Sequence, residues 1–178
     1  MYDYKKSKEA VESILRSPTK IVEKNLIPSS DSEFTYENGI KTWVGALFVD
    51  IVDSSKLFKS PNEDTARIIR SFCSEIISIL KDDSNYREIG IRGDCVYCIY
   101  NAPYQTDLVE IFRHAYRINS FMQMLNKLLN KFGFPTVRAG IGLGCSQDLI
   151  IKAGQSGSGI NDKIWIGKAV VDAAHLSD

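Results

Sequence analysis

Two strand-like apolar runs of this 178-residue chain are each followed closely by an aspartate. The first run, Trp43–Asp50, is rich in Val, Leu and Phe and ends in the acid itself. The second aspartate, Asp94, follows a glycine in a tight turn between the runs Tyr86–Arg92 and Cys95–Tyr100. A carboxylate at the edge of an apolar strand is costly to bury unless a partner neutralises it. If the two strands are neighbours in one sheet, their carboxylates converge on one place.

This arrangement favours a metal site over two unrelated structural aspartates. Two carboxylates and a backbone carbonyl make an oxygen site suited to Mg²⁺ or Mn²⁺, which substrate phosphates usually complete. Such a site serves phosphoryl or nucleotidyl transfer. The structural alternative is that an aspartate after a strand caps a helix and that Gly-Asp is a common turn pair. Either aspartate alone is more often structural, so the prediction depends on the pair.

Composition describes an ordinary globular domain and argues against several classes of partner. The chain is 44% apolar and 25% charged, its formal net charge is zero, and its length fits one domain. Balanced charge gives no electrostatic basis for binding DNA, RNA or an acidic membrane surface. No apolar run approaches the roughly 20 residues of a membrane span. The polar N-terminus leads into no signal-peptide core, so we expect a cytoplasmic protein.

The four cysteines give no signal for a metal site or a disulfide. Cys95 and Cys98 have the spacing of half a zinc site, but they fall in a strand, where residues three apart face opposite sides. No second pair or nearby histidine completes such a site. We therefore expect all four cysteines, which include Cys73 and Cys145, to be reduced thiols in the core.

The order of apolar patterns along the chain predicts an α+β fold. We expect strands at Trp43–Asp50, Tyr86–Arg92, Cys95–Tyr100, Val137–Leu143 and Lys163–Ile166, helices at Asn62–Leu80, Thr106–Lys131 and Lys168–Leu176, and a surface loop at Lys152–Asn161. An order of strand, helix, two strands, helix and strand is typical of a ferredoxin-like, mostly antiparallel sheet. We expect the helices of this sheet to lie on one face.

The N-terminal part is predicted to be an extension of that domain. Residues 5–25 have the periodicity of a helix that is interrupted by Pro18, and Leu26–Lys41 is predicted to be a linker with a turn. We therefore divide the chain into a helix and linker at residues 1–42 and a catalytic domain at residues 43–178.

The motifs of this catalytic domain resemble those of a known enzyme family. Phe48–Ser55 is similar to the first metal motif of class III nucleotidyl cyclases, and Arg92–Asp94 is similar to their second. The two aspartates are 44 residues apart (94 minus 50), which is the usual spacing in that family. Val137–Gly144 resembles the family's next central strand, and Ile166–Leu176 resembles a helix start near the domain end. The resemblance covers the proposed catalytic domain in the family's order.

The resemblance implies a class III cyclase fold and a reaction that converts a nucleoside triphosphate to a 3′,5′-cyclic monophosphate and pyrophosphate. It implies two Mn²⁺ or Mg²⁺ ions per site, held by Asp50, Asp94 and the backbone carbonyl of Ile51. Gly93 would let the backbone approach the phosphates. Because members of the family act as head-to-tail dimers with composite sites, the resemblance also implies a homodimer with two equivalent sites.

Cationic residues near the ends of the domain are further candidates for the site. Lys168 and Arg138 are candidates for phosphate contacts, with ordinary surface charges as the alternative. His175 stands where the family has a transition-state arginine, and it can donate to a phosphate oxygen less strongly than a bidentate arginine. Val171 replaces the asparagine that positions the ribose.

The positions that read a purine base in the family are also changed. Gly90 replaces the base-reading lysine of adenylate cyclases, and Ile164 replaces their base-reading aspartate. A purine edge would therefore face unpaired or apolar groups. We expect a pyrimidine triphosphate as substrate, UTP ahead of CTP, since the chain most resembles the pyrimidine cyclases of the Pycsar antiphage systems, which make a second messenger for defence. A purine cyclase and a catalytically silent binding or dimerisation module are the alternatives.

Overall fold

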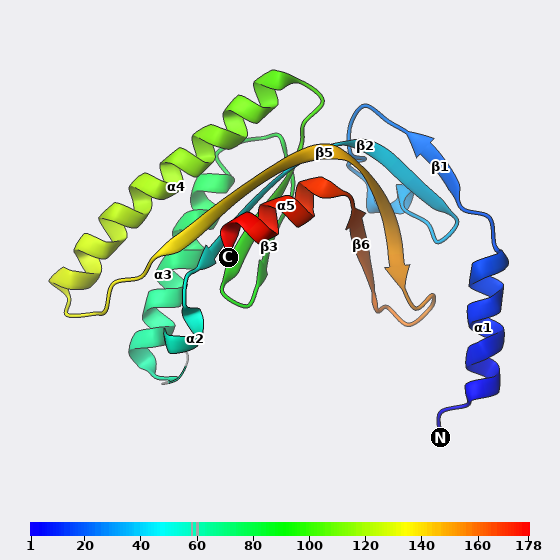
Figure 1. Cartoon of the computed structure of the whole chain (residues 1–178), viewed down its shortest axis with the longest axis horizontal. Coiled ribbons are helices and arrows are strands. Elements are labelled where there is room, and N and C mark those ends of the chain that lie inside the picture. Colours follow the sequence, from blue (N-terminus) through cyan, green and yellow to red (C-terminus); the bar gives the residue numbers. More distant parts are fainter. Residues whose placement is uncertain (58, 60) are drawn as a thin grey trace.

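One curled, mostly antiparallel sheet organises the chain (Figure 1). The structure, a computed structural model, describes residues 1–57, 59 and 61–178. Among these residues, five strands follow one another in the order β3-β4-β2-β5-β6, and β1 pairs in parallel with the start of β2. The strands are β1 (Lys20–Glu23), β2 (Asn38–Ile51), β3 (Tyr86–Arg92), β4 (Cys95–Asn101), β5 (Ala139–Gly154) and β6 (Asn161–Ile166). The helices are α1 (Tyr4–Arg16), α2 (Ser54–Leu57), α3 (Glu63–Leu80), α4 (Gln105–Lys131) and α5 (Lys168–Ser177), with a 3₁₀ turn at Asp31–Glu33.

The central part of the sheet has the predicted ferredoxin-like order. β2 lies between β4 and β5 and runs antiparallel to both, α3 connects β2 to β3, and α4 connects β4 to β5. Side chains of β2 alternate between the two faces of the sheet. Leu47, Val49 and Ile51 join the core beneath α3 and α4, whereas Phe48 packs on the other face. The predicted α+β, mostly antiparallel fold is confirmed.

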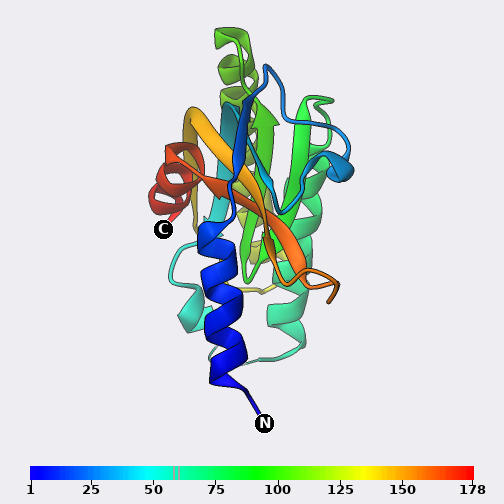
Figure 2. The ribbon, with the colours of Figure 1, turned by 90° about the vertical axis from the view of Figure 1, so that its right-hand side faces the viewer.

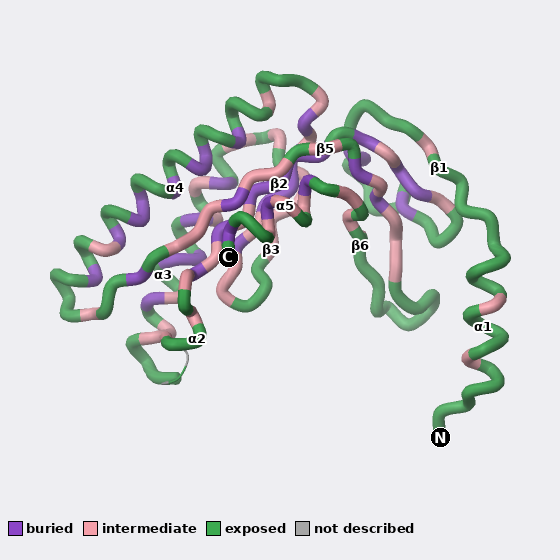
Figure 3. Tube along the Cα trace, in the orientation of Figure 1, coloured by how far each residue is buried: buried purple, intermediate pink, exposed green. Residues whose placement is uncertain are grey.

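Helices α3 and α4 cover the outer face of the curl. Ile68, Phe72 and Ile76 recur at intervals of four residues along α3 and are at most 1% exposed. This spacing places them on one stripe of the helix, which faces the sheet. Burial of each such side chain contributes roughly 1.5–3 kcal/mol. Figure 3 shows the same division, with buried segments of α4 turned inward and exposed segments turned outward.

The prediction that all helices lie on one face is wrong, because α5 packs on the inner face of the curl (Figure 1). The helix approaches β5 so closely that a Cβ at Gly142 would overlap the carbonyl oxygen of Ala173. The three glycines of β5 that allow this approach are Gly140, Gly142 and Gly144. A strand with a side chain at these positions would leave no space for the helix backbone.

The curl brings the two outermost strands together. Lys163 Nζ of β6 lies 3.5 Å from Glu88 Oε2 of β3, and both side chains are largely buried. Arg92 Nη2 of β3 lies 3.5 Å from Asp162 Oδ2 of β6 in an exposed pair. An exposed pair contributes little because water screens it, so Lys163–Glu88 is the stronger contact. Figure 2 shows the β5–β6 hairpin curving across the other strands.

The N-terminal segment differs from the prediction of one interrupted helix. α1 ends at Arg16, two residues before Pro18, and Lys20–Glu23 forms β1 beside β2. A proline disfavours helical backbone in the residue before it. The residues after Pro18 can instead form hydrogen bonds with the unpaired edge at the start of β2. α1 itself has no buried residue (Figure 3). The division at residue 42 stays a prediction.

Two central strands are longer than their apolar patterns indicate. β2 begins at Asn38 rather than Trp43, and β5 continues to Gly154 rather than ending at Leu143. Polar residues and glycines interrupt the alternation in both extensions, so the pattern ends before the hydrogen-bonded strand does. The first residues of the loop expected at Lys152–Asn161 therefore belong to β5.

The cysteines are all free, as predicted, but they are not all in the core. Cys145 is exposed on β5, which contradicts the prediction of a core thiol at that position. Burial raises the pKa of Cys95 to about 11 and that of Cys98 to about 12, so both stay protonated near neutral pH.

Candidate metal-binding and catalytic site

The structure brings Asp50 and Asp94 together. Asp50 lies near the end of β2 on the inner face, and Asp94 lies in the turn between β3 and β4. β2 and β4 are neighbours, and the pairing of Val49 with Val96 places both aspartates at the same end of the two strands. Burial raises the pKa of Asp50, and the neighbouring Asp94 carboxylate raises it further.

The oxygen atoms of this pair lack enough donors in the protein. Asp50 Oδ1 accepts a hydrogen bond from the backbone N–H of Ile51 at 3.1 Å. Asp94 Oδ2 is buried and has no hydrogen-bond partner among the described residues. A buried carboxylate oxygen without a donor, beside a second carboxylate, is unfavourable unless a cation is present. The residues present therefore fit a divalent metal ion.

The protein supplies only part of a metal's coordination shell here. No group of three or more His, Cys, Asp or Glu side chains with metal-binding geometry occurs among the described residues. Two carboxylates leave several positions for water and phosphate oxygens, which is the usual situation for Mg²⁺. This donor set suits ions that bind together with a nucleotide.

Gly93 makes the turn that carries Asp94 possible. Its φ is +64°, in the left-handed region that glycine adopts without steric cost. A Cβ at this position would contact nothing within 4 Å, so backbone conformation alone favours glycine there. The open space around Gly93 is compatible with its predicted approach to phosphates.

The end of β2 borders a cavity of about 610 Å³, whose lining includes Ile51, Lys56 and Arg138. The backbone N–H of Val52 donates to the carbonyl of Arg138 at 3.0 Å, which holds the segment after Asp50 against the start of β5. Arg138 therefore lies beside the end of β2, with its side chain exposed, but the lining of this cavity includes neither Asp50 nor Asp94.

The other two predicted site residues lie on α5. Lys168 begins the helix, is exposed, and lies 3.9 Å from Asp172 in an ion pair. His175 is exposed in the last turn. Within the described part of the chain, neither side chain forms a hydrogen bond or an ion pair with Asp50 or Asp94. Such contacts therefore do not connect the two residues to the aspartates among the described residues of one protomer.

The chain is similar in sequence to two uridylate cyclases. It is 46% identical over 177 residues to the uridylate cyclase of Treponema porcinum, covering 99% of this chain and 62% of that protein. It is 32% identical over 183 residues to the uridylate cyclase of Gulbenkiania mobilis, covering 98% of this chain and 70% of that protein. The chain belongs to the uridylate cyclase family. No family model matches it.

Solved structures agree with this family membership at the level of the fold. A class III adenylyl cyclase-like ATP-binding protein from Pseudomonas aeruginosa superposes with a TM-score of 0.73 at 19% identity, over 96% of this chain and 39% of that one. The predicted class III cyclase fold is thereby confirmed. This member of the uridylate cyclase family spans about 62% of the length of its Treponema relative. No described helix combines the length and hydropathy that a membrane span requires.

Sequence reasoning missed a second group of residues on the inner face of this uridylate cyclase family member. The ring of Tyr97 fills the space beside Gly90, so that a Cβ at Gly90 would overlap it. Tyr97 stacks on Phe48 with ring centroids 5.4 Å apart, and its hydroxyl donates to Glu88 Oε1 at 2.8 Å. Burial, followed by this hydrogen bond, raises the pKa of Tyr97 to about 12. The pairing of Gly90 with Tyr97 across two strands predicts this contact once the hairpin register is known.

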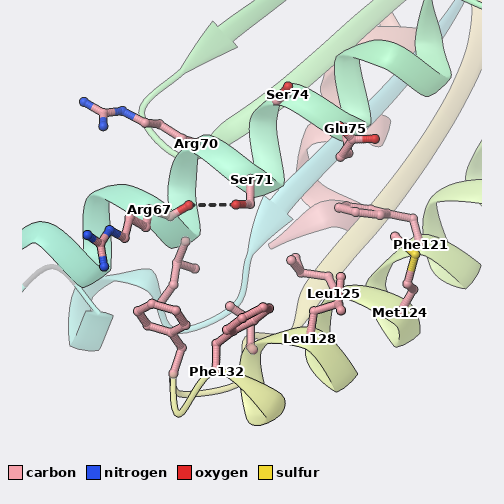
Figure 4. Close-up of a pocket in the computed structure, with 13 residues that line it drawn as sticks. Arg67, Arg70, Ser71, Ser74, Glu75, Phe121, Met124, Leu125, Leu128 and Phe132 are labelled. Carbon is pink, nitrogen blue, oxygen red and sulfur yellow. Dashed lines mark hydrogen bonds between the residues drawn. The ribbon is translucent and has the colours of Figure 1, made fainter.

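A groove of about 580 Å³ on the outer layer lies away from this chemistry (Figure 4). It runs between α3 and α4, and apolar side chains of α4 such as Met124, Leu128 and Phe132 line one side. Arg67 and Glu75 of α3 line the other side. The groove is on the opposite face of the sheet from Asp50 and contains no carboxylate pair, so we do not assign the metal site to it.

Proposed function

We propose that this chain forms a homodimeric uridylate cyclase that converts UTP to 3′,5′-cyclic UMP and pyrophosphate. The observation that carries the proposal is the meeting of Asp50 and Asp94, with a buried and unpartnered oxygen on Asp94. The sequence similarity to two uridylate cyclases supports the choice of substrate.

The reaction is an intramolecular displacement at phosphorus. The ribose 3′-oxygen forms a bond to the α-phosphorus, the bond from that phosphorus to the bridging oxygen of the β-phosphate breaks, and the 3′-hydroxyl proton is released. Pyrophosphate leaves with the electron pair of the broken bond. Two bound Mn²⁺ or Mg²⁺ ions would lower the pKa of the 3′-hydroxyl and neutralise the leaving group.

The chain's own residues would hold and orient the reacting groups. Asp50, Asp94 and the backbone carbonyl of Ile51 bind the ions, and Gly93 leaves room for the phosphates beside them. Arg138, beside the end of β2, would contact a phosphate oxygen through its exposed guanidinium. Fixing the 3′-oxygen in line with the α-phosphorus supplies much of the rate enhancement in this class of reaction.

A second copy of the chain would complete each site. Lys168 and His175 are exposed and, among the described residues, form no hydrogen bond or ion pair with the aspartates of their own protomer. In the proposed dimer, Lys168 and His175 face the phosphates bound at the partner's aspartates and donate to them. A two-fold symmetric dimer then contains two equivalent sites.

Two sequence positions support a pyrimidine rather than a purine substrate. Gly90 has no side chain and Ile164 no polar group, so neither can hydrogen-bond a purine edge. The ring of Tyr97 also occupies space that a longer residue at Gly90 would need. We propose UTP ahead of CTP, and a role of the cyclic product as a cytoplasmic second messenger in antiphage defence.

The test is incubation of the purified protein with each of the four ribonucleoside triphosphates and Mn²⁺, followed by mass spectrometry. Cyclic UMP is the expected product, and cyclic CMP would keep the pyrimidine assignment while changing the base. Cyclic AMP or GMP would overturn the substrate assignment. No product from a folded, dimeric protein would favour the silent module, for which the substitutions at Val171 and His175 are the supporting observation.

A further inference from the structure

A second buried carboxylate lies outside the metal site, at the beginning of α5. Asp148 of β5 is 0% exposed and is paired across the strands with Thr42 of β2, which is also 0% exposed. Asp148 Oδ2 and Thr42 Oγ1 have no hydrogen-bond partner among the described residues. The proposed reaction gives this aspartate no role, and burial of an ionisable group requires a physical reason.

Asp148 and Ser146 together cap α5 from the neighbouring strand. The hydroxyl of Ser146 accepts the backbone N–H of Ala169 at 2.8 Å and donates its own proton to Asp148 Oδ1. Asp148 Oδ1 also lies 3.5 Å from the same N–H. The residue that precedes the helix, Gly167, has no side chain with which to cap it. A cap normally comes from that residue, so the strand replaces it here.

Gly167 is needed for this arrangement. A Cβ at Gly167 would overlap the carboxylate of Asp148, so any other residue would displace the acid from the helix terminus. Burial raises the pKa of Asp148, while its hydrogen bonds to Ser146, Ala169 and Val170 lower it. The donors at the helix terminus therefore compensate part of the cost of burying this carboxylate.

The capped helix ends beside the metal pair. Its carbonyl groups follow the glycines of β5 from Gly144 to Gly140, where the carbonyl of Ser177 occupies the place of a Cβ. Gly140 is the cross-strand partner of Asp50. A shift of α5 along the glycines would therefore change the surroundings of Asp50.

We propose that Asp148 is a positioning residue, which acts through Ser146 to fix α5 along β5 and so aligns the helix with the Asp50–Asp94 site. This inference rests on the proposed function, because alignment matters only if α5 takes part in the site. A misplacement of about 1 Å can lower a rate by roughly 100-fold. The substitutions that remove the cap should therefore affect turnover more than substrate binding.

The experiment compares Asp148→Ala, Ser146→Ala and Asp148→Asn with two controls at Ile150, which is also fully buried on β5. Ile150→Val and Ile150→Ala provide two degrees of destabilisation for matching melting temperatures. Steady-state kinetics are measured with the triphosphate that the wild-type protein uses, and amide hydrogen exchange is measured over residues 168–177. We expect Asp148→Ala and Ser146→Ala to lower kcat by about 10- to 100-fold with KM changed less than about threefold.

Asp148→Asn serves as the conservative rescue, because an asparagine oxygen still accepts from Ser146. We expect its kcat to stay within about threefold of wild type, and the Ile150 control matched in melting temperature to keep wild-type kcat. Equal kcat losses in the matched control, or an Asp148→Asn variant as impaired as Asp148→Ala, would overturn the positioning role. If Asp148→Ala does not fold, a Ser146→Ala variant with wild-type kcat overturns it equally.

The two proposals fail in different ways. A folded wild-type protein without cyclase product removes the proposed function, and the catalytic part of this inference with it. Hydrogen exchange that is faster over α5 in Ser146→Ala than in the Ile150 control would then still support the cap. An active wild-type protein with unchanged kcat in folded Ser146→Ala and Asp148→Ala variants rejects the positioning role and leaves the cyclase assignment intact.

Discussion

Helix α5 lies between two carboxylate sites that differ in how their charge is compensated. At its C-terminal end, burial and then the charge of the neighbouring Asp94 raise the pKa of Asp50. At its N-terminal end, Asp148 stands alone and accepts from Ser146 and the first backbone N–H groups of the helix. Each site contains a buried carboxylate oxygen without a partner. Both sites are built from aspartates, and the hydrogen-bond donors around each carboxylate determine its role.

The first site needs a ligand, whereas the fold supplies donors to one carboxylate oxygen of the second. A pair of acids with a single backbone donor between them is unfavourable until a cation arrives. A lone acid at a helix N-terminus is stabilised by the N–H groups and the helix dipole. The Asp50–Asp94 site is therefore suited to bind a cation, and the Asp148 site is suited to fix the start of α5.

The largest expected effect is loss of turnover on changing the metal pair. Asp94→Asn should lower kcat by about 1,000-fold or more, because one of two charged metal ligands is lost. The assay is cyclic nucleotide production measured by mass spectrometry. The matched control is Asp53→Asn, since Asp53 has φ of 59°, which asparagine tolerates. Activity retained in Asp94→Asn would reject the metal assignment.

The Asp94→Asn variant also tests whether the acidic pair binds the metal. Mn²⁺ should raise the melting temperature of the wild-type protein and leave that of Asp94→Asn nearly unchanged, because binding to the native state alone stabilises it. In EDTA the variant should be at least as stable as wild type, since the repulsion with Asp50 is removed. A variant that gains as much from Mn²⁺ as the wild type would place the ion elsewhere.

The next effect concerns the glycines that bring α5 to the metal pair. Gly142→Ala should destabilise the protein by about 3 kcal/mol, because its Cβ meets the backbone of Ala173 and neither can move easily. Gly93→Ala should cost about 1–2 kcal/mol through its positive φ alone. Urea unfolding measures both. Equal losses would mean that α5 can move away from β5 at little cost.

The pH dependence of stability tests the buried acid. Because the pKa of Asp148 in the folded state is raised above its ordinary value of 3.8, the native state binds the proton more tightly than the unfolded state does. Stability should therefore fall as pH rises from about 3.8 through the folded pKa. The Asp148→Asn variant does not lose stability in this way. Its free energy of unfolding relative to wild type should therefore increase across this pH range and then level off. Urea unfolding measures this difference in free energy between the variant and wild type, and a difference that does not change with pH would contradict the prediction.

The smallest effect is expected on α1, which contacts neither carboxylate site. Ile14 is 73% exposed, so Ile14→Ala should change the free energy of unfolding by less than about 0.5 kcal/mol. Ile76→Ala on α3, which is 0% exposed, should cost about 3 kcal/mol. Chemical denaturation at two protein concentrations measures both. A loss at Ile14 that depends on concentration would show that α1 packs in an oligomer.

The local sequence pattern predicted the outer layer of helices and singled out the two aspartates. α3 and α4 are long and strongly amphipathic, and the Gly-Asp turn between two apolar runs predicted the β3–β4 hairpin. The convergence of Asp50 and Asp94 followed from placing both at the same end of neighbouring strands. The helices and the hairpin depend on residues close in sequence, whose periodicity reflects which side chains are buried. The meeting of Asp50 and Asp94 required in addition that β2 pair with β4.

Contacts between distant segments were not available from such patterns. β1 forms only because the start of β2 accepts it, and the glycines of β5 interrupt a strand pattern when read alone. They become a surface for α5 only once that helix packs on the inner face. The cap formed by Ser146 and Asp148 joins residues more than 20 positions apart, and no local rule assigns a helix cap to a neighbouring strand.

Sequence patterns alone predicted the amphipathic helices that cover the sheet and the Gly-Asp turn that carries Asp94, because burial and turn formation act within a few residues. The packing of distant segments set which face α5 covers, which aspartate caps it, and that its C-terminal end lies beside the strand partner of Asp50. These outcomes depend on close approach of backbone to backbone and on where buried charges find donors. Both are set only when the curled sheet brings distant strands together.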